Sequence, residues 1–160
     1  MANTFIKKRK RRYPKPTQFI PKNQSKYRGD LTNIVIRSNL EKRFALWCDR
    51  ASSVVGWVSE ELIIPYISPV DGQKHRYFVD FRIWVLDSTG KVTEYWVEIK
   101  PKAETMPPVN PTRKTAKSQQ NLQEAIATFA VNQAKWEAAT GVAESRGCKF
   151  LVVTDEDLGV

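Results

Sequence analysis

The pattern of apolar and polar positions first becomes regular near residue 40. Four apolar residues recur at i, i+4, i+7 and i+8, and therefore share one face of a helix: Leu40, Phe44, Trp47 and Cys48. The preceding stretch from Ser38 to Glu41 matches the capping-box pattern of a helix start. We therefore expect a helix that buries this face and ends around Ala51. The apolar run 34–36 before it fits either a short strand or the entry to the helix.

Shorter runs rich in β-branched and aromatic residues follow, and these predict strands. They cover residues 54–58, 61–67, 76–86 and 92–99. Pro65 either interrupts the second run or places it at a sheet edge. Turn signatures at 69–72 and 87–90 separate the later runs. The last two runs therefore predict a β-hairpin or meander.

Residues 101–118 contain four prolines and no periodicity, which predicts a long loop, either functional or disordered. A helix is expected from about Lys117 to Thr140, with Gly141 as its stop. One face of this helix carries Leu122, Ile126, Phe129, Gln133 and Trp136. The apolar run 149–153 predicts a short strand, parallel to its neighbour because a helix precedes it. This order predicts a single α/β domain over residues 31–160, with a mixed β-sheet flanked by helices.

Residues 1–30 lack apolar periodicity, contain three prolines, and predict an extended or disordered N-terminal arm. Ten of the 26 Lys and Arg residues lie in residues 1–28, which hold no acid; the rest of the chain has 16 basic and 17 acidic residues. Such an arm is typical of a segment that binds a polyanion. Six consecutive residues are expected to contact the DNA backbone without reading sequence: Lys7, Lys8, Arg9, Lys10, Arg11 and Arg12. An acidic protein surface, a nuclear-import signal or a solubilising tail are the alternatives.

The composition argues against several classes of function. With one histidine and two cysteines one hundred positions apart, the chain lacks the cluster that a zinc site or a Ser-His-Asp triad needs. Its seven glycines are scattered and form no phosphate-binding loop. No apolar run approaches the ~20 residues of a membrane span, and no apolar signal-peptide core follows the basic cluster. We therefore expect an intracellular protein that does not act at a membrane.

The candidate chemistry lies on the two runs that flank residue 89. Alternation places Glu98 and Lys100 on one side of their strand, and a turn centred near 89 places Asp80 opposite Glu98. Two carboxylates and the Ile99 carbonyl are oxygen ligands that suit Mg²⁺, and Lys100 could orient the attacking water. This is a phosphodiesterase arrangement. The alternative is a set of surface cross-strand ion pairs, with no catalytic role.

Glu41 is the fourth candidate. A helix that precedes the sheet could lay its carboxylate over Asp80 and Glu98, where it would bind or position the metal ion. The same residue is also the acidic member of the capping box that begins at Ser38. A cap and a metal ligand compete for the same oxygens, so both interpretations stay open.

Glu41 on a first helix, then Asp80, then the tripeptide Glu98 to Lys100 resembles the PD-(D/E)xK nuclease superfamily, which has the restriction-endonuclease-like fold. Val79 stands where that motif often has proline. Transposon-end nuclease subunits share the same order of residues. Over about residues 27–102 the chain looks similar to the head completion nucleases of T-even-like tailed phages. The segments that carry this second resemblance are 27–30, 34–49, 57–72, 75–81 and 97–101.

The resemblance implies a phage-encoded DNA endonuclease that needs Mg²⁺, with Mn²⁺ able to substitute. It implies catalytic roles for Glu41, Asp80, Glu98 and Lys100, with the metal held by Asp80, Glu98, Ile99 and Glu41. Such a protein acts after genome packaging, in the host cytoplasm or at the head–neck region of the virion, where portal and neck proteins are possible partners. Two alternatives stay open. One is a structural virion component that binds DNA or portal without cutting, and the other is a Holliday-junction-resolvase-like nuclease.

Overall fold

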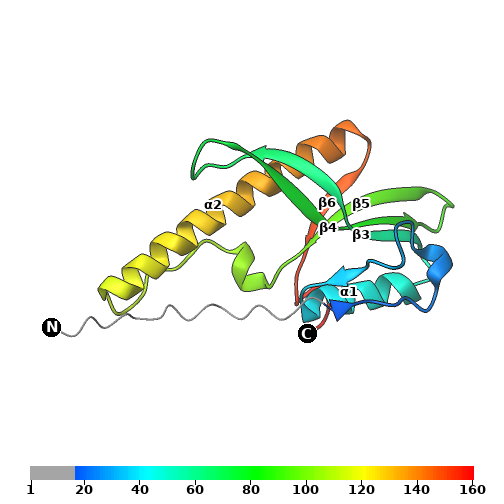
Figure 1. The fold of residues 1–160 in the computed structure, drawn as a ribbon, viewed down its shortest axis with the longest axis horizontal. Coiled ribbons are helices and arrows are strands. Elements are labelled where there is room, and N and C mark those ends of the chain that lie inside the picture. Colours follow the sequence, from blue (N-terminus) through cyan, green and yellow to red (C-terminus); the bar gives the residue numbers. More distant parts are fainter. Residues whose placement is uncertain (1–16) are drawn as a thin grey trace.

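The computed structural model describes residues 17–160, and its centre is a mixed four-stranded sheet (Figure 1). The strands are β3 (Val54–Ile67), β4 (Lys74–Leu86), β5 (Val92–Ile99) and β6 (Lys149–Val153). The first three form an antiparallel meander, and β6 lies parallel to β5 at the edge of the sheet. The predicted meander and the predicted parallel last strand are therefore confirmed.

Two helices cover opposite faces of this sheet. Trp96 and Val97 follow each other on β5 and so point to opposite faces. Val97 packs in the cluster under α1 (Asn39–Arg50), and Trp96 packs in the cluster under α2 (Ala116–Ser145). The predicted α/β fold, a mixed sheet flanked by helices, is confirmed. Within residues 17–160, neither helix is both long and apolar enough to cross a membrane.

Helix α1 begins as predicted, but its buried face is rotated from the predicted one. The Ser38 hydroxyl accepts a hydrogen bond from the Glu41 N–H at 3.1 Å, which is the expected N-cap. Phe44 and Cys48 are buried, whereas Trp47 is 44% exposed, so its predicted burial is wrong. The buried stripe turns toward Asp49 instead, because the segment that precedes the helix packs against that side.

That preceding segment corrects the predicted boundary of the N-terminal arm. β1 (Thr17–Gln18) pairs with β2 (Val35–Ile36), and a 3₁₀ turn, η1 (Gln24–Lys26), follows β1. Phe19 and Tyr27 are buried with their rings against Trp57. The backbone N–H groups of Lys22 and Asn23 donate to the Asp49 carboxylate at 2.9 and 3.0 Å. Residues 17–30 thus belong to the domain; the cluster from Lys7 to Arg12 lies outside the described residues.

The predicted strands 54–58 and 61–67 are one long edge strand, β3, with a β-bulge in its middle. The register with β4 shifts between Ser59 and Leu62, and Glu60 has a φ of 53°. This left-handed conformation is uncommon for a residue with a Cβ. The Glu60 carboxylate forms an ion pair with Arg37, whose Nε lies 2.6 Å from Oε1. A bulge bends its strand and increases the local twist.

Beyond the bulge, β3 and β4 continue past the rest of the sheet as a two-stranded arm that curls over α2 (Figure 1). β4 pairs with β5 only from Phe81 to Leu86. Val79 packs in the α2 cluster, whereas Phe81 packs in the α1 cluster. Asp80 therefore lies where β4 parts from β5, at an opening in the sheet.

The segment between β5 and α2 is partly structured, and α2 is longer than predicted. A 3₁₀ helix, η2 (Lys102–Thr105), follows β5 directly. Helix α2 passes through Gly141 and ends at Ser145, so the predicted stop is wrong. Gly147, with a φ of 73°, supplies the left-handed residue just beyond the helix instead. Ile126 on the predicted apolar face is 52% exposed, because the first half of α2 extends beyond the sheet (Figure 1).

Candidate active site

The structure brings Asp80 and Glu98 together as the turn position predicted. The β4–β5 ladder pairs Phe81 with Val97 and Leu86 with Val92, which is the register symmetric about residue 89. At Asp80 the ladder ends, and the Ile99 N–H donates to the Asp80 Oδ2 atom at 2.8 Å. The Asp80 carboxylate thus takes the place of a backbone acceptor at the point where the two strands part.

Glu98 is held on both of its carboxylate oxygens. Its side chain comes from β5 and is buried. The Tyr77 hydroxyl donates to Oε2, and the Lys100 Nζ atom lies 3.3 Å from Oε1. An ammonium and a phenol hydroxyl on one buried carboxylate fix its orientation. The carboxylate is therefore positioned before any ligand arrives.

Two carboxylates, of Asp80 and Glu98, lie near the ammonium of Lys100, and the excess of acidic groups at this position favours binding of a cation. Burial raises the pKa of Asp80 well above its ordinary value; the nearby Glu98 adds to this, and the hydrogen bond from Ile99 partly opposes it. Burial works to lower the pKa of Lys100, but Glu98 and Asp80 outweigh it, so the pKa of this lysine is raised. Lys100 therefore stays charged. A bound cation would relieve the repulsion between the two carboxylates.

Glu41 lies near these groups and is partly engaged by its own helix. Its Oε2 atom accepts the Arg37 N–H at 3.0 Å, one residue earlier than a capping box would require. Burial raises the pKa of Glu41, against the opposing hydrogen bonds from Arg37 and Ser38. Its charge acts on both Asp80 and Lys100. The predicted N-cap at Ser38 is confirmed, but the predicted capping box is not, because the Glu41 carboxylate accepts the Arg37 N–H and not that of Ser38. The role of Glu41 at the site stays a prediction.

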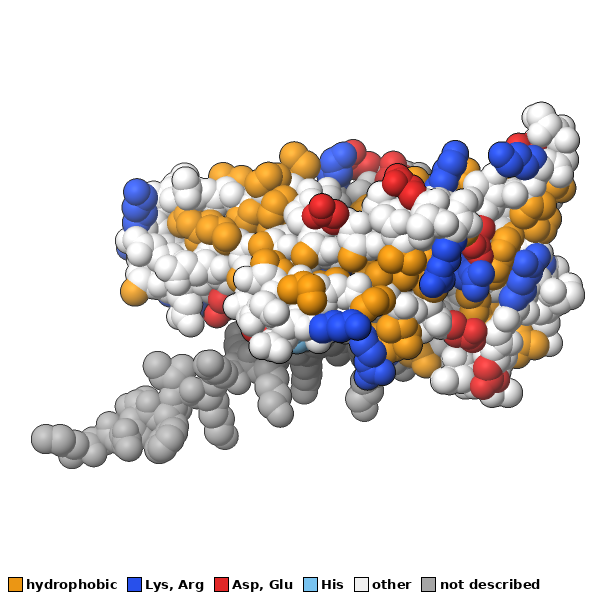
Figure 2. Space-filling model, turned by 90° about the horizontal axis from the view of Figure 1, so that it is seen from above, with side chains coloured by type: hydrophobic (Ala, Val, Ile, Leu, Met, Phe, Trp, Pro, Cys, Tyr) orange, Lys and Arg blue, Asp and Glu red, His pale blue; other side chains and the backbone are white. Residues whose placement is uncertain are grey.

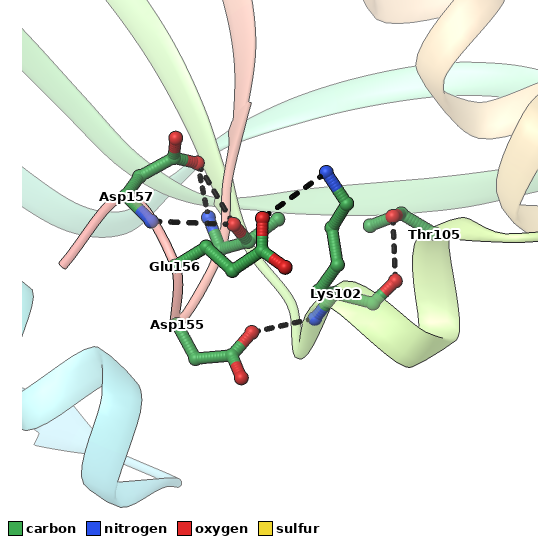
Figure 3. A network of polar contacts seen from close by, with 6 residues as sticks. Lys102, Thr105, Asp155, Glu156 and Asp157 are labelled. Carbon is green, nitrogen blue, oxygen red and sulfur yellow. Dashed lines mark hydrogen bonds and ion pairs between the residues drawn. The ribbon is translucent and has the colours of Figure 1, made fainter. Parts of the chain in front are cut away.

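Polar contacts fix the chain around Lys100, and Figure 3 shows those that join Lys102 of η2 to the turn after β6. The Lys100 N–H donates to the Val153 carbonyl at 3.0 Å, which extends the pairing of β5 with β6. The Lys102 N–H donates to the Asp155 carboxylate at 2.7 Å, and its Nζ atom lies 3.5 Å from the Glu156 Oε2 atom. The turn after β6 therefore anchors η2, and with it the backbone that carries Lys100.

The fit of a metal ion can be judged from the donors present. No group of three or more His, Cys, Asp or Glu side chains with the spacing of a metal site occurs within residues 17–160. A divalent ion would therefore rest on Asp80 and Glu98, completed by a backbone carbonyl such as that of Ile99 and by water. That oxygen set fits Mg²⁺, which retains several waters in proteins. Direct ligation by Glu41 stays a prediction.

Three residues of this neighbourhood were not predicted from the sequence: Arg37, Tyr77 and Lys135. Glu60 also lies here, although the sequence favoured a solvated strand start for it over the rim of the site. Arg37 and Glu60 form the ion pair at the bulge, and the charge of Arg37 also acts on Glu41 and Asp80. Tyr77 reaches Glu98 from the arm of the hairpin. Lys135 comes from α2, and its charge acts on Asp80 and Glu98. Three tertiary features place these residues: the bulge, the curl of the arm and the docking of α2. Local sequence patterns do not indicate any of these features.

A separate hollow lies away from the carboxylates. It has a volume of about 710 Å³ and is formed by α1 and the C-terminal segment, with Phe44, Trp47 and Leu158 among its lining residues. None of the four predicted catalytic residues lines it. Trp47 is exposed because it lines this hollow.

The described part of the chain carries little net charge. Residues 17–160 hold 19 Lys and Arg and 17 Asp and Glu. Figure 2 shows basic and acidic side chains interspersed on the face it presents, with hydrophobic side chains between them. The remaining seven basic residues lie in residues 1–16.

Comparison with known proteins places the chain in a family. The model of the TnsA-like endonuclease N-terminal family matches residues 51–155, a span that includes Asp80, Glu98 and Lys100 and excludes Glu41. The chain is 45% identical over 141 residues to a head completion nuclease of Enterobacteria phage T4, covering 88% of this chain and 91% of that protein. No solved structure matches the chain. The chain belongs to the TnsA-like endonuclease family and has its restriction-endonuclease-like fold.

Proposed function

We propose that the protein is a metal-dependent DNA endonuclease that hydrolyses phosphodiester bonds during completion of the phage head, after genome packaging. The observation that carries this proposal is the convergence of Asp80, Glu98 and Lys100 where β4 parts from β5. The match to an endonuclease family over the same residues supports it. The similarity to a head completion nuclease supports the stage of assembly.

Each side chain has a definite task in this proposal. Asp80 and Glu98, with the Ile99 carbonyl, would hold Mg²⁺, and Mn²⁺ would substitute because it accepts the same oxygen donors. The ion would polarise a phosphoryl oxygen and acidify water at the site. Lys100, charged and fixed on Glu98, would orient the attacking water and offset negative charge on the phosphate. Glu41 would complete the acidic site from α1.

The substrate would be held without regard to its sequence. The cluster from Lys7 to Arg12 would contact phosphates, because six adjacent cations bind a polyanion strongly at low salt. Residues 17–160, with nearly balanced charge, would add specific contacts close to the site. Action at the packaged head would place the protein in the host cytoplasm or at the virion neck, beside portal and neck proteins.

A plasmid-nicking assay with matched lysine variants tests this function. Wild-type protein should convert supercoiled plasmid to nicked or linear forms with Mg²⁺ or Mn²⁺, and a chelator should stop the reaction. Lys100→Ala should lower the rate by about 100-fold or more, which is typical when a charge-stabilising group is removed. DNA binding should stay close to wild type, and urea unfolding should show a folded protein that is less stable, because Glu98 loses its ion pair. Lys102→Ala is the matched control and should cleave normally, because it keeps the backbone N–H that binds Asp155 and loses only an exposed ion pair with Glu156.

The alternatives predict different outcomes of the same assay. Cleavage that survives both the chelator and Lys100→Ala would contradict the assignment of the site. Silence across metals and DNA forms, with DNA binding retained, would favour a structural virion component. Selective cleavage of branched DNA by a stable dimer would favour a junction resolvase.

A further inference from the structure

Lys135 lies on α2 and is held firmly beside the candidate active site. Its neighbours along the helix, Asn132, Trp136 and Ala139, are buried against the sheet, so this turn of α2 cannot move independently. The Lys135 side chain is half-buried. Its Nζ atom lies 5.6 Å from the centre of the Tyr77 ring and 5.7 Å from that of Tyr66. Tyr77 is the residue whose hydroxyl binds Glu98.

Among the described residues, this ammonium has no carboxylate within the 4.0 Å of an ion pair, although two carboxylates lie nearby. Glu98 already binds Lys100 and Tyr77, and Asp80 accepts the Ile99 N–H. The two aromatic faces attract Lys135 only weakly, by about 0.5–2 kcal/mol. Burial lowers the pKa of Lys135, Glu98 and Asp80 partly offset this, and Lys100 adds to it. A half-buried cation with these surroundings is suited to an anion that comes from outside the chain.

We infer that Lys135 binds a phosphate group of the DNA at the active site, as a second cation beside Lys100. This inference rests on the proposed function, since it names how the same site holds its substrate. A cation bound by Asp80 and Glu98 would weaken the attraction of both carboxylates for Lys135. The ammonium could then turn from the tyrosine faces toward phosphate oxygens. Tyr66 and Tyr77 would support the lysine stem while its charged end contacts the DNA.

The test uses the full-length chain with Lys135→Met, Lys135→Arg and Lys149→Met. Met keeps the stem and removes the charge, and Arg keeps the charge. Lys149 is exposed and begins β6, where it pairs with Tyr95, three positions before Glu98 on β5, so it is the matched control. DNA binding is measured against salt concentration with Ca²⁺ in place of Mg²⁺, because Ca²⁺ takes the same oxygen donors in a looser geometry. Cleavage is then measured in Mg²⁺ over a range of DNA concentrations.

Loss of one phosphate contact should make the slope of log affinity against log salt shallower by about 0.9 in Lys135→Met. Cleavage efficiency should fall by about tenfold or more, the scale of a lost charged contact. Lys135→Arg should keep the wild-type salt slope and Lys149→Met should keep both quantities. A Lys135→Met protein with the wild-type slope and cleavage would overturn the inference. So would a wild-type slope with lower thermal stability, since that pattern indicates a packing role alone.

Two further measurements keep the outcome decisive. If Lys135→Met does not fold, an amine-reactive reagent on the wild-type protein replaces it; bound DNA should slow modification of Lys135 and leave Lys149 unchanged. Equal rates with and without DNA would contradict the inference. If the wild-type protein binds DNA but cuts none with any metal, the endonuclease proposal fails. The salt slope of Lys135→Met still decides the role of Lys135 in that case.

Discussion

At the scale of single residues, the site is a set of charges that are fixed in place before substrate arrives. Glu98 is held by Lys100 and Tyr77, and Asp80 by the Ile99 N–H. Buried like charges at short range are costly in the absence of a cation. The pKa of Asp80 is therefore raised in the folded protein. This direction fixes how the free energy of unfolding should change with pH.

The first prediction concerns Asp80→Asn in metal-free buffer. A carboxyl group with a raised folded-state pKa contributes most to stability below its unfolded pKa of about 4, and this contribution is lost as pH rises through the folded value. At pH 8 the metal-free protein has therefore lost this contribution, and the Asp80 carboxyl group destabilises it. Asp80→Asn should increase the free energy of unfolding there by about 1–4 kcal/mol, the range by which well-packed neutral replacements of buried ion pairs stabilise proteins. The gain should shrink toward zero near pH 4, as measured by urea unfolding with a chelator present.

Asp87→Asn is the control of opposite sign. Hydrogen bonds from Thr89 and Lys91 lower the pKa of this exposed turn residue, so its contribution is present at pH 8 and lost as pH falls. Its substitution should be neutral or destabilising at pH 8. Mg²⁺ should stabilise the wild-type protein and should stabilise Asp80→Asn much less. An Asp80→Asn protein less stable than wild type at pH 8 would contradict the proposed electrostatics.

At the scale of elements, both helices carry an N-cap, but only one cap lies beside the site. Ser38 caps α1 in the turn that presents Glu41. Thr115 caps α2 through a reciprocal bond with Ser118, at the end of the helix that extends beyond the sheet. The two caps are chemically alike and differ in what packs on them. Comparing them therefore separates the local contribution of a cap to stability from the contribution of tertiary packing.

The second prediction compares Ser38→Ala with Thr115→Ala. Ser38→Ala should lower the free energy of unfolding by about 1 kcal/mol, because α1 packs on the sheet from its first turns. Thr115→Ala should lower the free energy of unfolding by only about 0.2–0.4 kcal/mol, because an exposed helix end can fray without global unfolding. Urea unfolding of both variants measures the difference. Equal losses would show that the first half of α2 is as cooperative with the core as α1.

At the scale of the whole molecule, the N-terminal region divides into two parts with different tasks. Residues 17–30 pack on the domain through Phe19, Tyr27 and the contacts to Asp49. Residues 1–16 hold the basic cluster and lie outside the described residues. Fold and non-specific DNA affinity should therefore be separable by truncation.

The third prediction uses two truncations. Deleting residues 1–16 should leave the unfolding midpoint unchanged and make the salt slope of DNA binding shallower by about 5, if the six cations each contact one phosphate. Deleting residues 1–28 should also destabilise the domain by several kcal/mol, because the buried side chains of Phe19 and Tyr27 are lost, at about 3–5 kcal/mol for each aromatic. Thermal unfolding and binding titrations measure both. If the 1–16 deletion keeps the wild-type salt slope, the basic cluster does not bind DNA and the prediction is wrong.

The amino-acid sequence by itself determined what depends on neighbours in the chain. The cap at Ser38 and the register that pairs Phe81 with Val97 both follow from short-range pattern. A tight turn leaves two strands few ways to pair, so the position of the turn is enough to predict that Asp80 and Glu98 lie together. The order of elements likewise predicted the mixed sheet and its parallel last strand.

The tertiary structure decided what depends on contacts between distant segments. Tyr77 reaches Glu98 from the part of the hairpin beyond the bulge, and Lys135 lies beside the site because α2 packs against that hairpin. Phe19 is buried because Trp57, far along the chain, offers an aromatic surface to it. Such contacts depend on how whole elements pack. The residue pattern of one helix or strand does not indicate which other element packs against it. The pair of carboxylates was therefore readable in the sequence, whereas the groups that surround it required the fold.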